Sequence, residues 1–226
     1  NSNTEWKTIF NSIISKNIAS KDYFFNSIIL LDENQKFKNP TAWSSILDYE
    51  TYYKPQLVLN HYTKKTEVLT QDIENNIYLL NYKGERLWRK SIGNAILGDV
   101  HQIDRYKNNK LQFLFNTKDS IYLIDRNGNH VNPFPVASNQ TMSIPLALFD
   151  YDNNRNYRIL VPMENELKMY NSKGKVITGW ELLNTSSRIA HTPKHYQVFN
   201  KDYIIISEEN GGMHVLNRKG QPRFQL

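Results

Sequence analysis

Short apolar runs separated by polar turns recur along this chain at a nearly constant interval. In each run, four apolar or amphipathic residues precede Asn or Asp, two polar residues and Gly. Four such apolar residues suit a β-strand, and Asn or Asp first with Gly fourth is typical of a tight type I turn. The pattern therefore predicts a strand, a turn and a second strand that returns antiparallel. The runs lie at 77–84, 121–128, 167–174 and 213–220.

The glycines that end these runs are evenly spaced. Gly84, Gly128, Gly174 and Gly220 lie 44, 46 and 46 residues apart. A degraded copy occupies 29–35, with Gln35 in place of the glycine. We expect the return strands at 86–90, 130–136, 175–181 and 223–226.

Two more apolar runs precede each turn. One contains the residue 15 positions before the glycine: Leu69, Phe113, Ile159 or Ile205. The other lies one strand earlier, at 57–59, 100–103, 147–149 and 197–199, and polar hairpin loops separate the two. Each repeat of 44–46 residues thus predicts about four short strands, which is typical of a propeller blade. No window of comparable length shows a sustained helical period.

We therefore predict an all-β fold, a β-propeller or propeller segment of about five four-stranded antiparallel blades. It forms one domain over 1–226, with 1–10 as the remnant outer strand of a preceding unit. The predicted units are 11–47, 48–92, 93–136, 137–183 and 184–226. Whether five units close a ring or belong to a larger propeller stays open at this stage.

The tryptophans repeat at the same interval. Trp88 follows Trp43 by 45 residues, Trp180 follows Trp88 by 92, and Phe134 stands near the missing middle position. Side chains repeating at the blade period are expected to pack between blades. Together with the 14 tyrosines, exposed rings would alternatively form a carbohydrate-binding platform.

The chain resembles quinoprotein-like (PQQ-like, WD40-like) β-propeller repeats, in particular those of uncharacterised bacterial cell-envelope proteins. The resemblance covers about 43–226 and rests on the stretches at 55–61, 110–117, 123–130 and 149–155. It implies an exported scaffold, periplasmic or at the cell surface, without assigned catalysis. The chain departs from true quinone dehydrogenases in lacking a stacked cysteine pair and in carrying tryptophans in too few units.

Composition narrows the possible chemistry. The 226 residues carry a net charge of +6 with a pI near 9.3, which permits an anionic partner. The absence of cysteine excludes disulfides, thiolate metal sites and cysteine nucleophiles. The longest aliphatic runs, 28–31 and 204–206, are far shorter than the roughly 20 residues that span a bilayer. The chain shows no basic-then-apolar leader, so we expect any export signal to have been removed or left out.

Cationic residues recur in the turns between third and fourth strands. Equivalent turns of a propeller lie around one face, so the repeat predicts a basic rim that would attract an acidic protein or another anionic macromolecule. Solvation of the turns is the competing explanation for these charges. The rim residues are Lys83, Arg126, Lys173 and Lys219.

One loop resembles a calcium ligand set. Asp150, Asp152 and Asn154 carry oxygens at alternating positions, but no nearby Asp or Glu closes the loop. An ordinary hairpin loop, in which Asp and Asn tolerate turn geometry, explains these residues more simply. Apart from this weak calcium candidate, we expect no cofactor and no metal.

Catalytic motifs are not recognisable. His191 and His195 are separated by Thr-Pro-Lys, which prevents a helix from placing both on one face. Ser186 and Ser187 lack a nucleophile elbow, and no glycine-rich phosphate loop occurs. We therefore expect a non-catalytic interaction scaffold of the bacterial envelope that binds a protein or anionic macromolecule and no nucleic acid. The alternative is a carbohydrate-binding module.

Overall fold

The protein is all-β in the computed structural model, which describes residues 12–19, 24–31 and 43–224. These residues contain no helix, and hence none long and apolar enough to cross a membrane. The chain divides into two compact units, 1–43 and 44–226. In the first unit, strands β1 (Ser12–Ala19) and β2 (Phe24–Leu31) pair antiparallel. The predicted outer strand at 1–10 lies outside the described residues.

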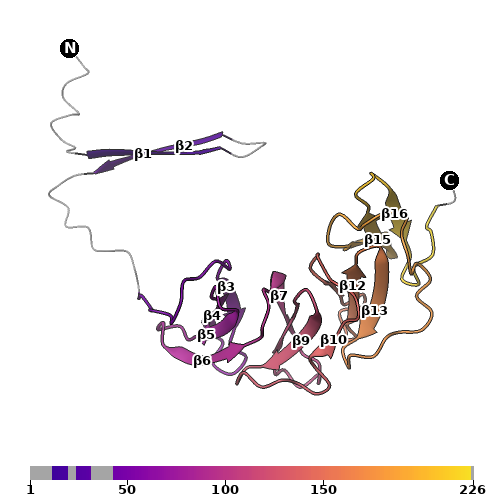
Figure 1. The fold of residues 1–226 in the computed structure, drawn as a ribbon, viewed down its shortest axis with the longest axis horizontal. Helices are drawn as coiled ribbons and strands as arrows, with labels where there is room; N and C mark the ends of the chain where they lie inside the picture. The colour runs from indigo at the N-terminus through magenta and orange to yellow at the C-terminus, as the bar shows by residue number, and fades with distance from the viewer. Residues whose placement is uncertain (1–11, 20–23, 32–42, 225–226) are drawn as a thin grey trace, which may run out of the picture. The chain divides into compact units, whose positions relative to one another are not determined.

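The second unit consists of four antiparallel sheets that follow one another in chain order (Figure 1). In each sheet, consecutive strands are neighbours, as the repeat predicts. The first sheet contains β3 (Gln56–Leu59), β4 (Thr66–Gln71), β5 (Asn76–Leu80) and β6 (Arg86–Ser91). The second contains β7 (Leu97–Ile103), β8 (Gln112–Asn116), β9 (Ser120–Asp125) and β10 (Val136–Ala137).

The third and fourth sheets have three strands each, which corrects the expected four. They contain β11 (Ala147–Phe149), β12 (Arg158–Met163) and β13 (Glu166–Asn171), then β14 (Lys194–Val198), β15 (Lys201–Ser207) and β16 (Met213–Leu216). Their predicted return strands are reduced to the bridges Tyr170–Val176 and Leu216–Pro222.

Proline explains part of this shortening. Pro222 occupies a pairing position in the last return segment but has no N–H to donate to a ladder. In the second sheet, Pro133 and Pro135 likewise lack the N–H groups that a ladder needs. Only the end of the expected strand at 130–136 forms a strand there, β10. The outer edge of these sheets is therefore held by a few hydrogen bonds and by side-chain packing.

The hydrophobic core lies between neighbouring sheets. Leu79 of the first sheet packs in one buried cluster with Phe115 of the second. Corresponding clusters join the second sheet to the third and the third to the fourth. Because these sheets are covered on two sides, β5 and β8 are buried at every position. This explains why their sequences are continuously apolar or amphipathic rather than alternating.

The outer face of the fourth sheet differs from its repeat equivalents. Met213 is 66% exposed, whereas the residues at the same distance before their glycines, Ile77, Ile121 and Leu167, are at most 2% exposed. Phe224 at the end of this sheet is 62% exposed. The described residues thus leave uncovered the face that every earlier sheet buries against its successor.

Candidate functional site

The four predicted turns share one hydrogen-bonding pattern. In each, the side-chain oxygen of the first residue accepts bonds from the backbone N–H groups two and four positions ahead, at 2.8–3.2 Å. The glycine N–H donates to the carbonyl of that first residue at 2.9–3.0 Å. This arrangement requires Asn or Asp first and explains the repeat in the sequence. The first residues are Asn81, Asp125, Asn171 and Asn217.

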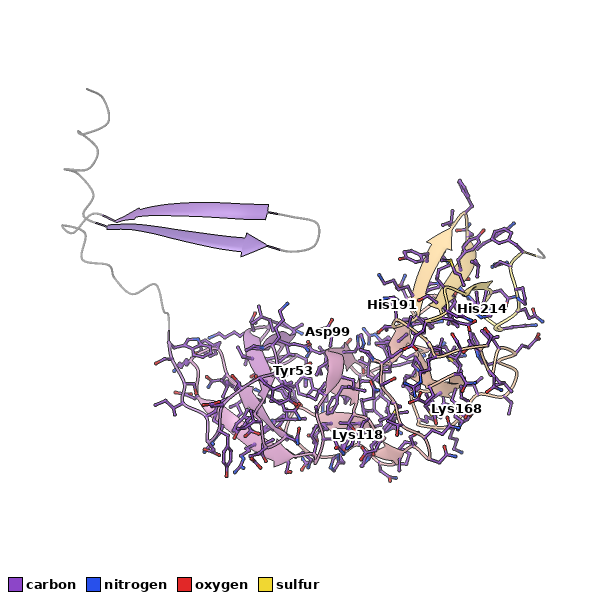
Figure 2. The ribbon with its side chains drawn as sticks, turned by 45° about the horizontal axis from the view of Figure 1, so that its top comes forward. Tyr53, Asp99, Lys118, Lys168, His191 and His214 are labelled. Carbon is purple, nitrogen blue, oxygen red and sulfur yellow. The ribbon has the colours of Figure 1, made fainter. Side chains whose placement is uncertain are left out.

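These turns lie at the same edge of their sheets as the hairpin loops after β3, β7 and β11, because consecutive strands alternate in direction. Contacts between sheets join these edges. The Arg155 guanidinium pairs with Asp104 at 2.5 Å, and Glu181 N–H donates to the Lys219 carbonyl at 2.8 Å. We call this surface the turn face. Lys118, labelled in Figure 2, follows β8 at the opposite edge.

Three of the four predicted rim cations are exposed on the turn face. Lys83, Lys173 and Lys219 each occupy the second position after the Asn of their turns. In the second sheet the equivalent position holds Asn127. The turn face therefore carries lysines from the first, third and fourth sheets.

Arg126 directly follows the Asx residue of its turn, Asp125, and its side chain reaches the neighbouring sheet. Its guanidinium pairs with the carboxylate of Glu67 on β4, whose side chain is only 3% exposed. Arg218 has the equivalent position in the last turn and pairs with Asp202 and Asp152. Directly after the Asx residue, the second and fourth turns thus hold arginines in ion pairs, whereas the lysines one position later are exposed. This distinction depends on acidic partners far away in the sequence.

The Asp202 carboxylate, which pairs with Arg218, also contacts His195 Nε2 at 2.8 Å. Burial alone would raise the pKa of Asp202, but hydrogen bonds from Arg218 and His195 outweigh it and hold that pKa below its usual range. The His195 ring also packs edge-on against Tyr151 at 4.9 Å between centroids. Arg218 and His195 of the fourth sheet, both bound to Asp202, therefore contact Tyr151 and Asp152 of the third and help to hold the two sheets together.

The candidate calcium loop has its oxygens engaged by protein donors. Asp150 accepts hydrogen bonds from the backbone N–H groups of Asn154 and Arg155 at 2.9–3.1 Å. Asp152 pairs with Arg218 at 2.8 Å, and Asn154 Oδ1 accepts from Asn156 N–H at 3.0 Å. The loop after β7 repeats this pattern around Asp104. Among the residues the structure describes, no group of three His, Cys, Asp or Glu side chains could hold a metal.

Glu208 organises the second cluster that contains a histidine. Its carboxylate accepts a hydrogen bond from the Ser186 hydroxyl at 2.6 Å and contacts His214 Nε2 at 2.5 Å. Hydrogen bonds from Ser186 and His214 hold the pKa of Glu208 at about 2. The carboxylate lies between the hydroxyl and the imidazole, so this histidine is not placed to activate the serine as a nucleophile.

A cavity of about 520 Å³ lies along the inner strands of the second, third and fourth sheets. Asp99, labelled in Figure 2, His101 and His195 are among its lining residues. Burial lowers the pKa of His101, and the nearby Asp99 carboxylate opposes this effect. Sequence reasoning assigned no function to these residues, because their proximity depends on three successive sheets turning their first strands to the same side.

Two of the three periodic tryptophans, Trp88 and Trp180, pack between sheets as predicted. Trp180 is 6% exposed and belongs to the cluster between the third and fourth sheets. Trp88 is half-buried between the first and second sheets, and its Nε1–H donates to the Arg126 carbonyl at 2.8 Å. These two indoles are therefore not available as an exposed platform for sugar rings.

Comparison with solved structures identifies the class of fold. The WD40 domain of Neurospora crassa Pan2 is similar with a TM-score of 0.51 and 15% identity, over 77% of this chain and 50% of that one. BBS1N, solved in complex with ARL6DN, is similar with a TM-score of 0.56 and 9% identity, over 82% and 62%. A weaker likeness, with a TM-score of 0.36 and 13% identity over 89% and 71%, extends to BamB from Moraxella catarrhalis. No protein-family model and no curated protein matches the chain.

The protein has a β-propeller-type fold, which confirms the fold class predicted from its repeat. At 9–15% identity the two stronger likenesses show the fold alone. The chain spans 50% of the Pan2 WD40 domain and 62% of the BBS1N chain.

Proposed function

We propose that this protein is a non-catalytic interaction scaffold that binds an acidic protein through its turn face. The observation that carries the proposal is the recurrence of exposed lysines at one turn position, Lys83, Lys173 and Lys219. The positive field of cations gathered on one surface speeds association with an acidic partner and orients it.

Two further observations support this function. BBS1N, which has a similar fold, was crystallised in complex with ARL6DN. The carboxylates of Glu208 and Asp202 are occupied by hydrogen bonds and ion pairs that hold loops and sheets together. This favours a scaffold over an enzyme. The bacterial envelope, periplasmic or at the cell surface, is proposed as its location on the resemblance of the repeats alone.

The test compares two triple variants with equal changes in charge. Lys83→Glu, Lys173→Glu and Lys219→Glu together reverse the lysines of the turn face. The control, Lys54→Glu, Lys118→Glu and Lys194→Glu, makes the same total change in charge at exposed lysines of the opposite edge. The partner is first isolated by crosslinking in cells. Its affinity for each variant is then measured with purified proteins by calorimetry at two salt concentrations.

We expect the turn-face variant to lose most of the binding and the control to retain it. Binding by the unaltered protein should weaken as salt rises, because exposed charges are screened within about 10 Å at 0.1 M salt. Equal binding by both variants, or binding indifferent to salt, would overturn the proposal.

A further inference from the structure

A cavity of about 390 Å³ opens on the turn face between the first and second sheets. Its wall is formed by the loop after β3, the loop after β7 with the start of β8, and the turn after β9 with the segment at 130–132 that follows it. His61 and Tyr62 come from the first, Tyr106 and Lys110 from the second, and Arg126 from the third. The cavity is therefore assembled from two repeats and exists only when both sheets are packed together.

His61 forms an inner part of this wall and is 9% exposed. Its Nδ1 accepts a hydrogen bond from the backbone N–H of Leu111 at 3.1 Å. In the neutral ring this places the proton on Nε2, which becomes a donor. Nε2 is buried and has no partner among the described residues. A buried donor left without an acceptor destabilises the site, so a ligand that accepts a hydrogen bond from it is favoured.

Arg126 supplies a second unpaired donor beside the same cavity. Its Nη2 pairs with Glu67, but its Nε–H is buried without a partner in the described part of the chain. The guanidinium thus uses Nη2 for its ion pair with Glu67, while its Nε–H remains available to a ligand. Arg126 is fixed in place by the Glu67 contact, which orients this remaining donor.

The cavity is positively charged on balance. Lys110 lines the cavity, and Lys64 lies in the same loop as His61. Besides burial, Arg126, Lys64 and Lys110 lower the pKa of His61, and Glu67 opposes them. The Asp125 carboxylate, which also lines the cavity, is engaged by N–H groups of its own turn. An entering group therefore meets donors and positive charge.

We propose that this cavity binds the carboxylate of an acidic side chain presented by the partner protein, with His61 Nε2–H and Arg126 Nε–H as donors and Lys110 in the cavity lining. The inference rests on the proposed function, because it assigns the partner's anchoring group. A carboxylate fits better than a phosphate, because a second negative charge would lie beside the buried Glu67. A neutral sugar would leave the charges of Lys64 and Lys110 unmatched.

The test uses the full chain and three defined probes: a glutamate-rich peptide, an oligogalacturonate and inorganic phosphate. Binding is followed by NMR at the Leu111 amide and the His61 imidazole, with Lys110→Gln and Lys107→Gln as matched variants. Both lysines are exposed in one loop, but Lys107 Nζ bonds to Asn156 and does not line the cavity. Neither substitution removes a buried group, so both variants should fold.

We expect the peptide to shift both His61 and Leu111 signals. Lys110→Gln should weaken its binding by about tenfold, the loss of one charge-assisted hydrogen bond, and Lys107→Gln should leave it unchanged. Tighter binding of phosphate or oligogalacturonate, equal effects of the two variants, or shifts away from His61 would overturn the inference.

The outcomes also separate this inference from the proposed function. If reversal of Lys83, Lys173 and Lys219 abolishes partner binding while the peptide leaves His61 unchanged, only the cavity assignment is wrong. If the peptide shifts the His61 signals but partner binding is unchanged when these lysines are reversed, only the proposed docking face is wrong.

Discussion

The indole of Trp88 in the first sheet lies directly against Gly128 in the turn of the second. A Cβ atom at position 128 would lie 3.1 Å from Cδ2 of the indole, and the glycine has φ = +86°. The third and fourth sheets repeat this contact with Trp180 and Gly220, where the corresponding distance is 3.0 Å. Phe134 approaches position 174 in the same way, at 3.4 Å. An aromatic ring from one sheet therefore covers the turn glycine of the next.

Substitution of Gly128 should separate backbone strain from packing. Gly128→Ala places an L-residue at positive φ, which costs about 1–2 kcal/mol, and also presses on Trp88. Gly93→Ala is the matched control, because Gly93 has φ = +77° but nothing within 4 Å of the added Cβ. We expect Gly128→Ala to lose more unfolding free energy in urea than Gly93→Ala. Equal losses would mean that the indole contact contributes nothing.

Removal of the buried indole tests the same contact from the other side. Trp180→Ala should cost about 3–5 kcal/mol of unfolding free energy, because it leaves a cavity between the third and fourth sheets. Leu87→Ala, at a side chain 40% exposed, is the control and should cost far less. Both are measured by urea denaturation. A small effect at Trp180 would contradict its role in joining the sheets.

Arg126 should behave as a structural residue, unlike the turn lysines. Arg126→Met leaves the buried Glu67 carboxylate unpaired, which typically costs about 3–5 kcal/mol. The double variant Arg126→Met with Glu67→Gln should recover part of this loss, because no unpaired charge remains. Lys83→Met should stay within about 0.5 kcal/mol of the unaltered protein. If Arg126→Met is as mild as Lys83→Met in chemical denaturation, the ion pair is unimportant for stability.

Glu208 should make stability depend on acid pH. Its pKa is about 2 in the folded protein against an ordinary value of 4.5, so its stabilising effect is complete above 4.5. The effect is lost as pH falls from 4.5 toward 2. Glu208→Gln should therefore be less stable than the unaltered protein at pH 6, and the difference should shrink toward pH 2. Urea denaturation across this range measures it, and a difference independent of pH would exclude the assigned hydrogen bonds.

Local signals identified much of the fold. Asn81, Asp125, Asn171 and Asn217 accept the predicted turn bonds because an Asx side chain and a glycine three residues later suffice to form them. Proline also carried information that the strand prediction left unused, since Pro222 marks a return segment that cannot form a full ladder.

The candidate site was less accessible to sequence reasoning. Lys83 and Arg126 are both cations in equivalent turns, yet one faces solvent and the other pairs with Glu67. Their positions in the turn differ by one residue, a signal that the sequence does contain. The acidic partner of Arg126, however, lies 59 residues earlier. His61 offered no signal at all, because its tautomer depends on the Leu111 amide 50 residues away.

The amino-acid order alone specified the repeat, its turns and the strands around them, because those features depend on hydrogen bonds and φ angles within a few residues. Packing of one sheet on the next decided which cations are neutralised, where the cavities lie and which aromatic rings are covered. Most of those properties arise from contacts between neighbouring sheets, whose residues lie far apart in the sequence, and such contacts form only once the apolar faces have met.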